Sequence, residues 1–166
     1  MTKIAFKGSP VNTSGTLPKV GDTAPDFTLV DGSLSEVKLS DFKGKNVILN
    51  IFPSLDTGVC AKSVRSFNEK AGSLDNTVVL GISSDLPFAS SRFCSLEGIK
   101  NTTALSVFRN DSFAKDYGVL LVDGPMKGLT ARAVVIVNPE GKVSYNQLVP
   151  EITEEPDYNS AIDSIV

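Results

Sequence analysis

The chain has 166 residues, with 16 lysines and arginines against 19 aspartates and glutamates, a formal net charge of −3 and no histidine. The length predicts one domain over residues 1–166, and the acidic balance argues against nucleic acid or an anionic membrane surface as a partner. The lack of histidine excludes Ser-His-Asp and Cys-His catalysis, histidine metal ligands and a haem with a proximal histidine.

The cysteine count narrows the function classes further. Cys60 and Cys94 are too few for a four-cysteine zinc site, and they form no CxxC pair. Such a low content is typical of a reducing cytoplasm, where the two are either inert core thiols or a transient redox couple. No apolar run approaches the roughly 18 residues of a membrane helix, and the first residues lack the apolar core of a signal peptide.

Turn residues and hydrophobic periodicity predict the secondary structure in chain order. Residues 1–17 are expected to form a hairpin whose turn falls at Gly8-Ser9-Pro10. Further strands are predicted over 27–30, 36–39, 46–52, 77–83, 102–106, 132–137 and 142–149. Helices are predicted over 59–71, 86–94, 111–117 and 157–165.

The order of these elements predicts the fold class. A strand, a helix and a second strand of this length form a right-handed parallel crossover, here over residues 46–83. The strands around the turn 138–141 make an antiparallel hairpin, and a helix ends the chain. This is the order of an α/β thioredoxin-like fold, in which helices flank a central mixed sheet, here with the N-terminal β-hairpin as an extension.

Cys60 lies in the first turn of the predicted helix 59–71. Val64, Phe67 and Ala71 follow it by 4, 7 and 11 positions, so all four side chains share one inward face. A helix N-terminus carries free N–H groups and a partial positive charge, which favour the thiolate, the nucleophilic form of cysteine. The alternative is that Cys60 is a small core residue.

The neighbours of this cysteine suggest a reactive site. Thr57 is expected to cap the helix with its hydroxyl and to bond the sulfur or a substrate oxygen. Pro53 ends the preceding strand, where its ring can shield the sulfur from water. A cation is also needed, and the local pattern does not select one: Lys62 and Arg65 lie on other helix faces, and Arg132 is one basic candidate among several.

The pattern Pro53-x-x-x-Thr57-x-x-Cys60 resembles the active site of the peroxiredoxins. The stretches 24–27, 50–60, 85–94 and 129–134 resemble, in order, the signature stretches of the bacterial thiol peroxidases, which are atypical two-cysteine peroxiredoxins. The resemblance covers essentially the whole chain.

This resemblance implies a complete set of roles. Cys60 would be the peroxidatic cysteine, Cys94 the resolving cysteine that forms a disulfide with it, and Arg132 the catalytic arginine. Thr57 would take part in catalysis, and Pro53 would line the substrate pocket. The implied substrates are hydrogen peroxide and alkyl hydroperoxides, the implied reductant is thioredoxin, and the family forms homodimers without a metal or organic cofactor.

Three other interpretations remain open from the residues alone. The first is a peroxide-sensing relay module without rapid turnover. The second is a thioredoxin-fold scaffold with inert thiols, and the third is a structural disulfide between the two cysteines. By itself, Cys94 is more often a core residue, because its helix is apolar around Phe88 and Phe93. The acidic stretch 151–157 is predicted to be a solvated connection.

The resolving step predicts a conformational change. A disulfide needs Cα atoms about 4.4–6.8 Å apart, whereas packed helices lie about 8–10 Å apart. We therefore expect the reduced protein to hold the sulfurs of Cys60 and Cys94 apart. The first turn at Cys60, the short helix that carries Cys94, or both, must then unwind for the bond to form.

Overall fold

The computed structural model describes residues 1–71 and 74–165. The strands are β1 (Thr2–Phe6), β2 (Ser9–Thr13), β3 (Thr28–Val30), β4 (Glu36–Lys38), β5 (Asn46–Ile51), β6 (Thr77–Ser83), β7 (Thr102–Ser106), β8 (Ala133–Val137) and β9 (Val143–Leu148). The helices are α1 (Gly58–Ala71), α2 (Pro87–Glu97), α3 (Phe113–Asp116) and α4 (Tyr158–Asp163), with a 3₁₀ turn, η1 (Leu39–Phe42).

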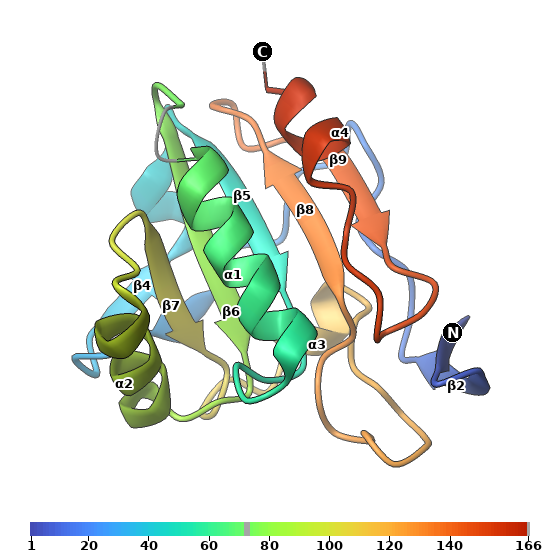
Figure 1. Ribbon diagram of the computed structural model, residues 1–166. Coiled ribbons are helices and arrows are strands. Elements are labelled where there is room, and N and C mark those ends of the chain that lie inside the picture. Colours follow the sequence, from blue (N-terminus) through green and yellow to red (C-terminus); the bar gives the residue numbers. More distant parts are fainter. Residues whose placement is uncertain (72–73, 166) are drawn as a thin grey trace.

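Seven strands form one mixed sheet in the order β4-β3-β7-β6-β5-β8-β9. Strands β5, β6 and β7 are parallel, while β8 is antiparallel to β5 and β9 antiparallel to β8. Helix α1 connects β5 to β6, as the sequence pattern predicts, and β1 and β2 form a separate hairpin. The predicted thioredoxin-like arrangement, with its N-terminal extension, is therefore confirmed (Figure 1).

Helices cover both faces of the sheet because the central strands are apolar on both sides (Figure 1). On one face, Ile48 of β5 packs with Phe67 of α1 and Ala161 of α4. On the other, the neighbouring Val47 and Leu49 join a larger cluster that includes Phe113 of α3. Successive strand residues point to opposite faces, so this single strand anchors both layers.

The hairpin turn differs from the prediction. It falls at Lys7-Gly8, and Ser9 and Pro10 belong to β2, where they pair with Phe6 and Ala5. Lys7 and Gly8 have φ angles of 50° and 79°. A two-residue hairpin turn that matches the twist of its strands needs positive φ at both positions, which glycine adopts most readily. The proline is tolerated because its partner Ala5 directs its N–H and carbonyl away from β2, to Pro150 and Ile152, so this pair needs no hydrogen bond from residue 10.

Several predicted boundaries also shift. Helix α2 continues to Glu97, one turn beyond the predicted end, so Cys94 lies inside the helix rather than closing it. Gly98 ends it in the left-handed conformation, with φ 66°. The predicted helices 111–117 and 157–165 are shorter, as α3 and α4, and β4 ends at Lys38 because Leu39 begins η1, which the sequence pattern did not predict.

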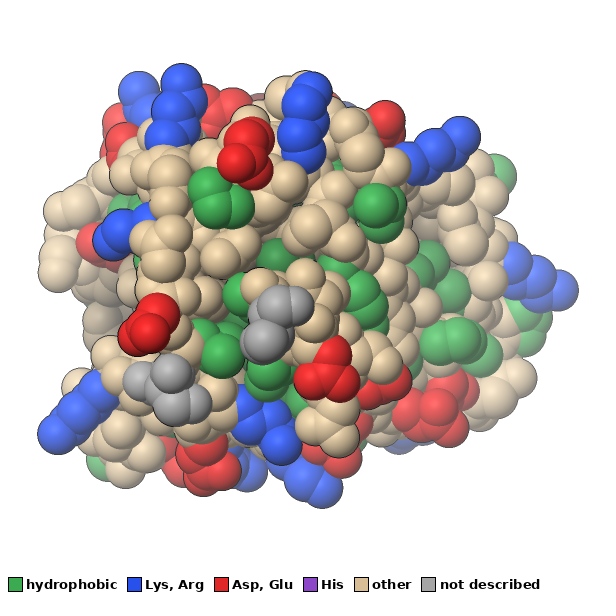
Figure 2. Space-filling view, turned by 90° about the horizontal axis from the view of Figure 1, so that it is seen from above, with side chains coloured by type: hydrophobic (Ala, Val, Ile, Leu, Met, Phe, Trp, Pro, Cys, Tyr) green, Lys and Arg blue, Asp and Glu red, His purple; other side chains and the backbone are tan. Residues whose placement is uncertain are grey.

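Figure 2 shows the end of the molecule at which α1 finishes. Positive and negative side chains both stand around the rim of this face, with hydrophobic side chains between them. Within the described ranges, no helix is long and apolar enough to cross a membrane.

The packing of α1 gives a stability prediction. Phe67 is fully buried, and its ring meets that of Tyr158 edge to face, with the centroids 5.1 Å apart. We expect Phe67→Ala to lower the free energy of unfolding by about 3–5 kcal/mol, because it leaves a cavity between α1, α4 and the sheet. Urea unfolding measures this loss. Leu96→Ala is the control: Leu96 is 80% exposed, so its loss should stay within about 0.5 kcal/mol. Similar losses in both variants would contradict the packing described here.

Candidate active site

Cys60 is the third residue of α1 and is completely buried. It packs in a small cluster with Phe52, Leu55 and Val64, and Phe93 of α2 lies against this cluster. The inward orientation predicted from the helix periodicity is therefore confirmed. The cluster brings the end of β5, the first turn of α1 and one side of α2 together around the sulfur atom.

Arg132 supplies the cation beside this sulfur. It directly precedes β8, and it is only 2% exposed. Its Nη2 donates a hydrogen bond to Cys60 Sγ at 3.2 Å, and its Nε donates to the Ile152 carbonyl oxygen at 2.8 Å. Among the described residues, its buried Nη1 has no hydrogen-bond partner. That nitrogen remains available as a donor to a bound molecule.

The sheet register explains why Arg132 reaches Cys60. Strand β8 pairs with β5 so that Ala133 lies opposite Ile51, which places Arg132 beside the end of β5 from which the chain enters α1. Local sequence could not select this arginine, because 72 positions separate it from the cysteine and only the pairing of two antiparallel strands brings them together.

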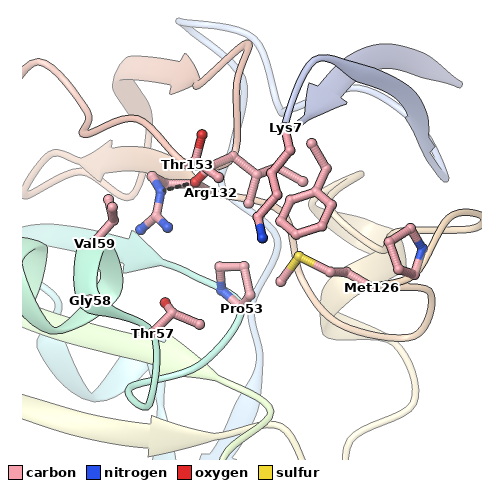
Figure 3. A pocket seen from close by; sticks show the side chains of 11 residues that line it. Lys7, Pro53, Thr57, Gly58, Val59, Met126, Arg132 and Thr153 are labelled. Atoms are coloured by element: carbon pink, nitrogen blue, oxygen red, sulfur yellow. Dashed lines mark hydrogen bonds between the residues drawn. The ribbon is translucent and has the colours of Figure 1, made fainter.

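Thr57 and Pro53 occupy the loop between β5 and α1. The Thr57 carbonyl accepts a hydrogen bond from the Ala61 N–H at 3.0 Å, so this residue does cap the helix. It does so through its backbone, since its hydroxyl donates to the Ser54 carbonyl at 3.1 Å. The predicted side-chain cap is therefore wrong. Figure 3 shows Thr57 and Pro53 at one side of a pocket, with Arg132 at another.

This pocket has a volume of about 380 Å³ and a mostly apolar wall. Its lining residues are Phe6, Lys7, Pro53, Thr57, Gly58, Val59, Pro125, Met126, Arg132, Ile152 and Thr153. Sequence reasoning placed Pro53, Thr57 and Arg132 near the site but missed Phe6, Lys7 and Met126. Phe6 ends β1 and Lys7 begins the hairpin turn. Figure 3 shows the Lys7 side chain extending from that turn into the pocket.

Glu151 fixes the hairpin turn next to the pocket. Its carboxylate accepts hydrogen bonds from the backbone N–H groups of Lys7 and Gly8, both at 3.0 Å, and from the Thr153 hydroxyl at 2.9 Å. The bonds from Gly8 and Thr153, with a smaller contribution from Lys7, lower the pKa of Glu151 to about 2. The prediction that 151–157 is only a solvated connection is therefore wrong at this residue.

Cys94 faces a different part of the molecule. It is half-buried on α2, burial raises the pKa of its thiol, and it lines a second cavity of about 260 Å³ with Ser90 and Thr102. Cys60 and Cys94 are both free thiols. The prediction that α2 is apolar around Cys94 is confirmed at Phe93, which packs against the Cys60 cluster. It is wrong at Phe88, which is exposed.

Comparison with known proteins places this arrangement in a family. The redoxin family pattern matches residues 19–162. The chain belongs to the redoxin family. It is 55% identical over 165 residues to a thiol peroxidase of Corynebacterium glutamicum and 52% identical over 165 residues to one of Mycobacterium bovis, with 99% of each chain covered in both cases.

Solved structures agree with this assignment. A peroxiredoxin-like protein from Aquifex aeolicus superposes with a TM-score of 0.93 at 43% identity, over 98% of this chain and 95% of the other. A thiol peroxidase from Chromobacterium violaceum shares the fold with a TM-score of 0.90 at 23% identity, over 98% and 95%. The predicted membership of the peroxiredoxins and the predicted enzyme class, a peroxidase, are both confirmed. Within residues 1–71 and 74–165, no group of three or more cysteine and carboxylate side chains could hold a metal ion.

The Glu151 contacts give a pH prediction. Because the pKa of Glu151 is about 2 in the folded protein and ordinarily 4.5, its stabilising effect is complete above pH 4.5 and is lost as the pH falls towards 2. We expect the melting temperature of the parent protein to fall more steeply over this range than that of Glu151→Gln. The comparison needs melting curves at each pH. Glu154→Gln is the control, since Glu154 is exposed, and it should follow the parent. Parallel curves for the parent and Glu151→Gln would refute the assignment.

Proposed function

We propose that this peroxidase reduces hydrogen peroxide and alkyl hydroperoxides through Cys60, forms a Cys60–Cys94 disulfide, and is recycled by thioredoxin. The observation that carries the proposal is the buried guanidinium of Arg132, which contacts Cys60 Sγ at 3.2 Å and keeps Nη1 unpartnered among the described residues. A cation that touches the sulfur and still has a free donor suits a nucleophilic thiolate with a polar substrate beside it.

In the first step, the Cys60 thiolate attacks the nearer oxygen of the peroxide. The O–O bond breaks, an S–O bond forms, and the leaving oxygen takes a proton, so that thiolate, hydroperoxide and a proton give sulfenic acid and an alcohol, or water from hydrogen peroxide. Negative charge develops on the leaving oxygen, and the unpartnered Arg132 Nη1 supports its stabilisation. Thr57 lines the same pocket, and its hydroxyl is the second proposed donor once it turns away from the Ser54 carbonyl to which it donates.

The pocket wall supports organic hydroperoxides as substrates beside hydrogen peroxide. Phe6, Met126, Ile152 and Val59 present apolar groups around the approach to Arg132. Such a wall binds an alkyl chain because burying apolar surface is favourable by roughly 25 cal/mol per Å². Pro53, buried at the base of the loop, keeps water from the sulfur.

In the second step, the Cys94 thiol attacks the sulfenic sulfur, so that a disulfide forms and water leaves. Cys60 is enclosed in its buried cluster while Cys94 lines a separate cavity, and the two thiols are not bonded, so we propose that one of them moves first. The 11-residue helix α2 is the segment we propose to unwind. Thioredoxin then reduces the disulfide by thiol–disulfide exchange, which restores both thiols.

We also propose that the enzyme is a homodimer and works in the cytoplasm. Leu86 and Phe88 are 52% and 66% exposed at the start of α2, and exposed apolar groups next to a reactive site support a protein interface there. A content of two cysteines in 166 residues favours a reducing compartment.

Substitution of the two cysteines tests the catalytic cycle. We expect Cys60→Ser to lose peroxide-dependent NADPH oxidation in an assay with thioredoxin and thioredoxin reductase, because a serine hydroxyl is a far weaker nucleophile. Cys94→Ser should react once with peroxide and then stop. Mass spectrometry should find sulfenic or over-oxidised Cys60 in that variant. Normal turnover in Cys94→Ser would refute the resolving role, and slow turnover of the parent protein would favour the sensing module.

The Arg132 geometry gives a separate kinetic prediction. Lysine keeps the charge of Arg132 but lacks the planar set of donors that contacts Cys60 and Ile152 at once. We expect Arg132→Lys to slow the peroxide step by about 100-fold, the size seen when one oxyanion donor is lost. Stopped-flow measurement of the reduced protein isolates this step. Lys62→Arg is a control, because Lys62 forms a surface ion pair with Glu155. An unchanged rate constant in Arg132→Lys would rule out a catalytic role.

A further inference from the structure

Asp85 joins the loop that precedes Cys60 to the segment that leads into α2. It lies between the end of β6 and the start of α2 and is half-buried. Its Oδ1 accepts a hydrogen bond from the Ser54 hydroxyl at 2.6 Å, and its Oδ2 accepts from the Leu55 N–H at 2.7 Å. The Ser83 hydroxyl also donates to Oδ2, at 2.7 Å. Three short bonds to one carboxylate are strong, charge-assisted contacts.

The residues that Asp85 holds belong to the active-site loop. The Ser54 hydroxyl also accepts the Asp56 N–H at 3.2 Å, and the Ser54 carbonyl accepts the Thr57 hydroxyl at 3.1 Å. Leu55 packs in the same buried cluster as Cys60. Asp85 therefore fixes the loop conformation that places Thr57 and the first turn of α1.

On its other side, Asp85 directly precedes Leu86, the N-cap of α2. The Leu86 carbonyl accepts the Ser90 N–H at 3.1 Å. Phe93, one residue before Cys94, packs against the cluster that contains Leu55 and Cys60. Loosening the Cys60 loop thus removes support from α2, and loosening α2 removes support from the loop.

We propose that Asp85 is a positioning residue that couples the two cysteine-bearing segments. While its three hydrogen bonds are intact, the Cys60 loop is ordered for reaction with peroxide and Cys94 stays on a folded α2. When they break, both segments are released together, which allows the Cys94 thiol to condense with the Cys60 sulfenic acid, with loss of water. The kinetic part of this inference rests on the proposed Cys60–Cys94 cycle, and the coupling itself does not.

Kinetics of the two steps test the proposal. Asp85→Ala removes both acceptor oxygens and so all three hydrogen bonds. We therefore expect the peroxide step to slow by about tenfold or more and the following disulfide step to become several-fold faster. Fewer Cys60 residues should be over-oxidised in each turnover. Asp85→Asn keeps one carbonyl acceptor and should show smaller shifts in the same directions. Asp56→Ala is the matched control, because Asp56 is an exposed acid in the same loop, and it should change neither step.

Hydrogen exchange on the reduced protein tests the coupling without any cysteine chemistry. Asp85→Ala should lower protection in residues 54–62 and 87–97 together, and Ser54→Ala should do so to a smaller extent. If Asp85→Ala does not fold, Asp85→Asn and Ser54→Ala carry the same test. Loss of protection in one segment only, or equal slowing of both kinetic steps, would overturn the proposal. The two proposals can also fail separately. If the parent protein forms no Cys60–Cys94 disulfide, the proposed cycle is refuted. The coupling still stands in that case if Asp85→Ala lowers protection in both segments.

Discussion

The contact between the guanidinium of Arg132 and the sulfur of Cys60 is the interaction on which the rest of the structure depends. Burying an arginine is costly unless its charge and its N–H groups are matched. Here one nitrogen contacts the sulfur, a second contacts the Ile152 carbonyl, and a third has no partner among the described residues. Proteins retain an unsatisfied buried donor chiefly where function requires it.

Several parts of the fold hold this contact in place. The pairing of β5 with β8 brings the arginine to the end of β5, and the cluster of Phe52, Leu55 and Val64 fixes the cysteine from the other side. Beyond the arginine, Glu155 is a nearby carboxylate. Burial raises the pKa of Glu155, but hydrogen bonds from Lys62 and Tyr158 and the charges of Lys62 and Arg132 outweigh that effect and lower it. The acidic segment thus stabilises positive charge on this side of the molecule.

The sequence predicts well the features of the site that depend on neighbouring residues. It predicts poorly the features that depend on contacts between distant segments. The helix periodicity places Cys60 on the inward face of α1, because that inference needs only a repeat of 3.6 residues. Arg132 follows from a family resemblance and not from its own surroundings, since its position depends on strand register. Phe6, Lys7 and Met126 could not be found, because they reach the pocket from the hairpin and a distant loop. The glycine at position 8 was the sequence signal that could have placed the hairpin turn at Lys7-Gly8. The prediction of one domain over 1–166 stays a prediction.

The attachment of Arg132 to the Ile152 carbonyl has a consequence for synthesis of the chain. Ile152 also donates its N–H to the Ala5 carbonyl, so the first strand and the last loop close on each other beside the arginine. A chain emerging from the ribosome has made Cys60 long before residue 152 is available. The nascent protein therefore carries its cysteine without a fixed arginine until nearly the whole chain has emerged. Under the proposed mechanism, Arg132 is held in place to assist Cys60 only when the two ends of the polypeptide meet.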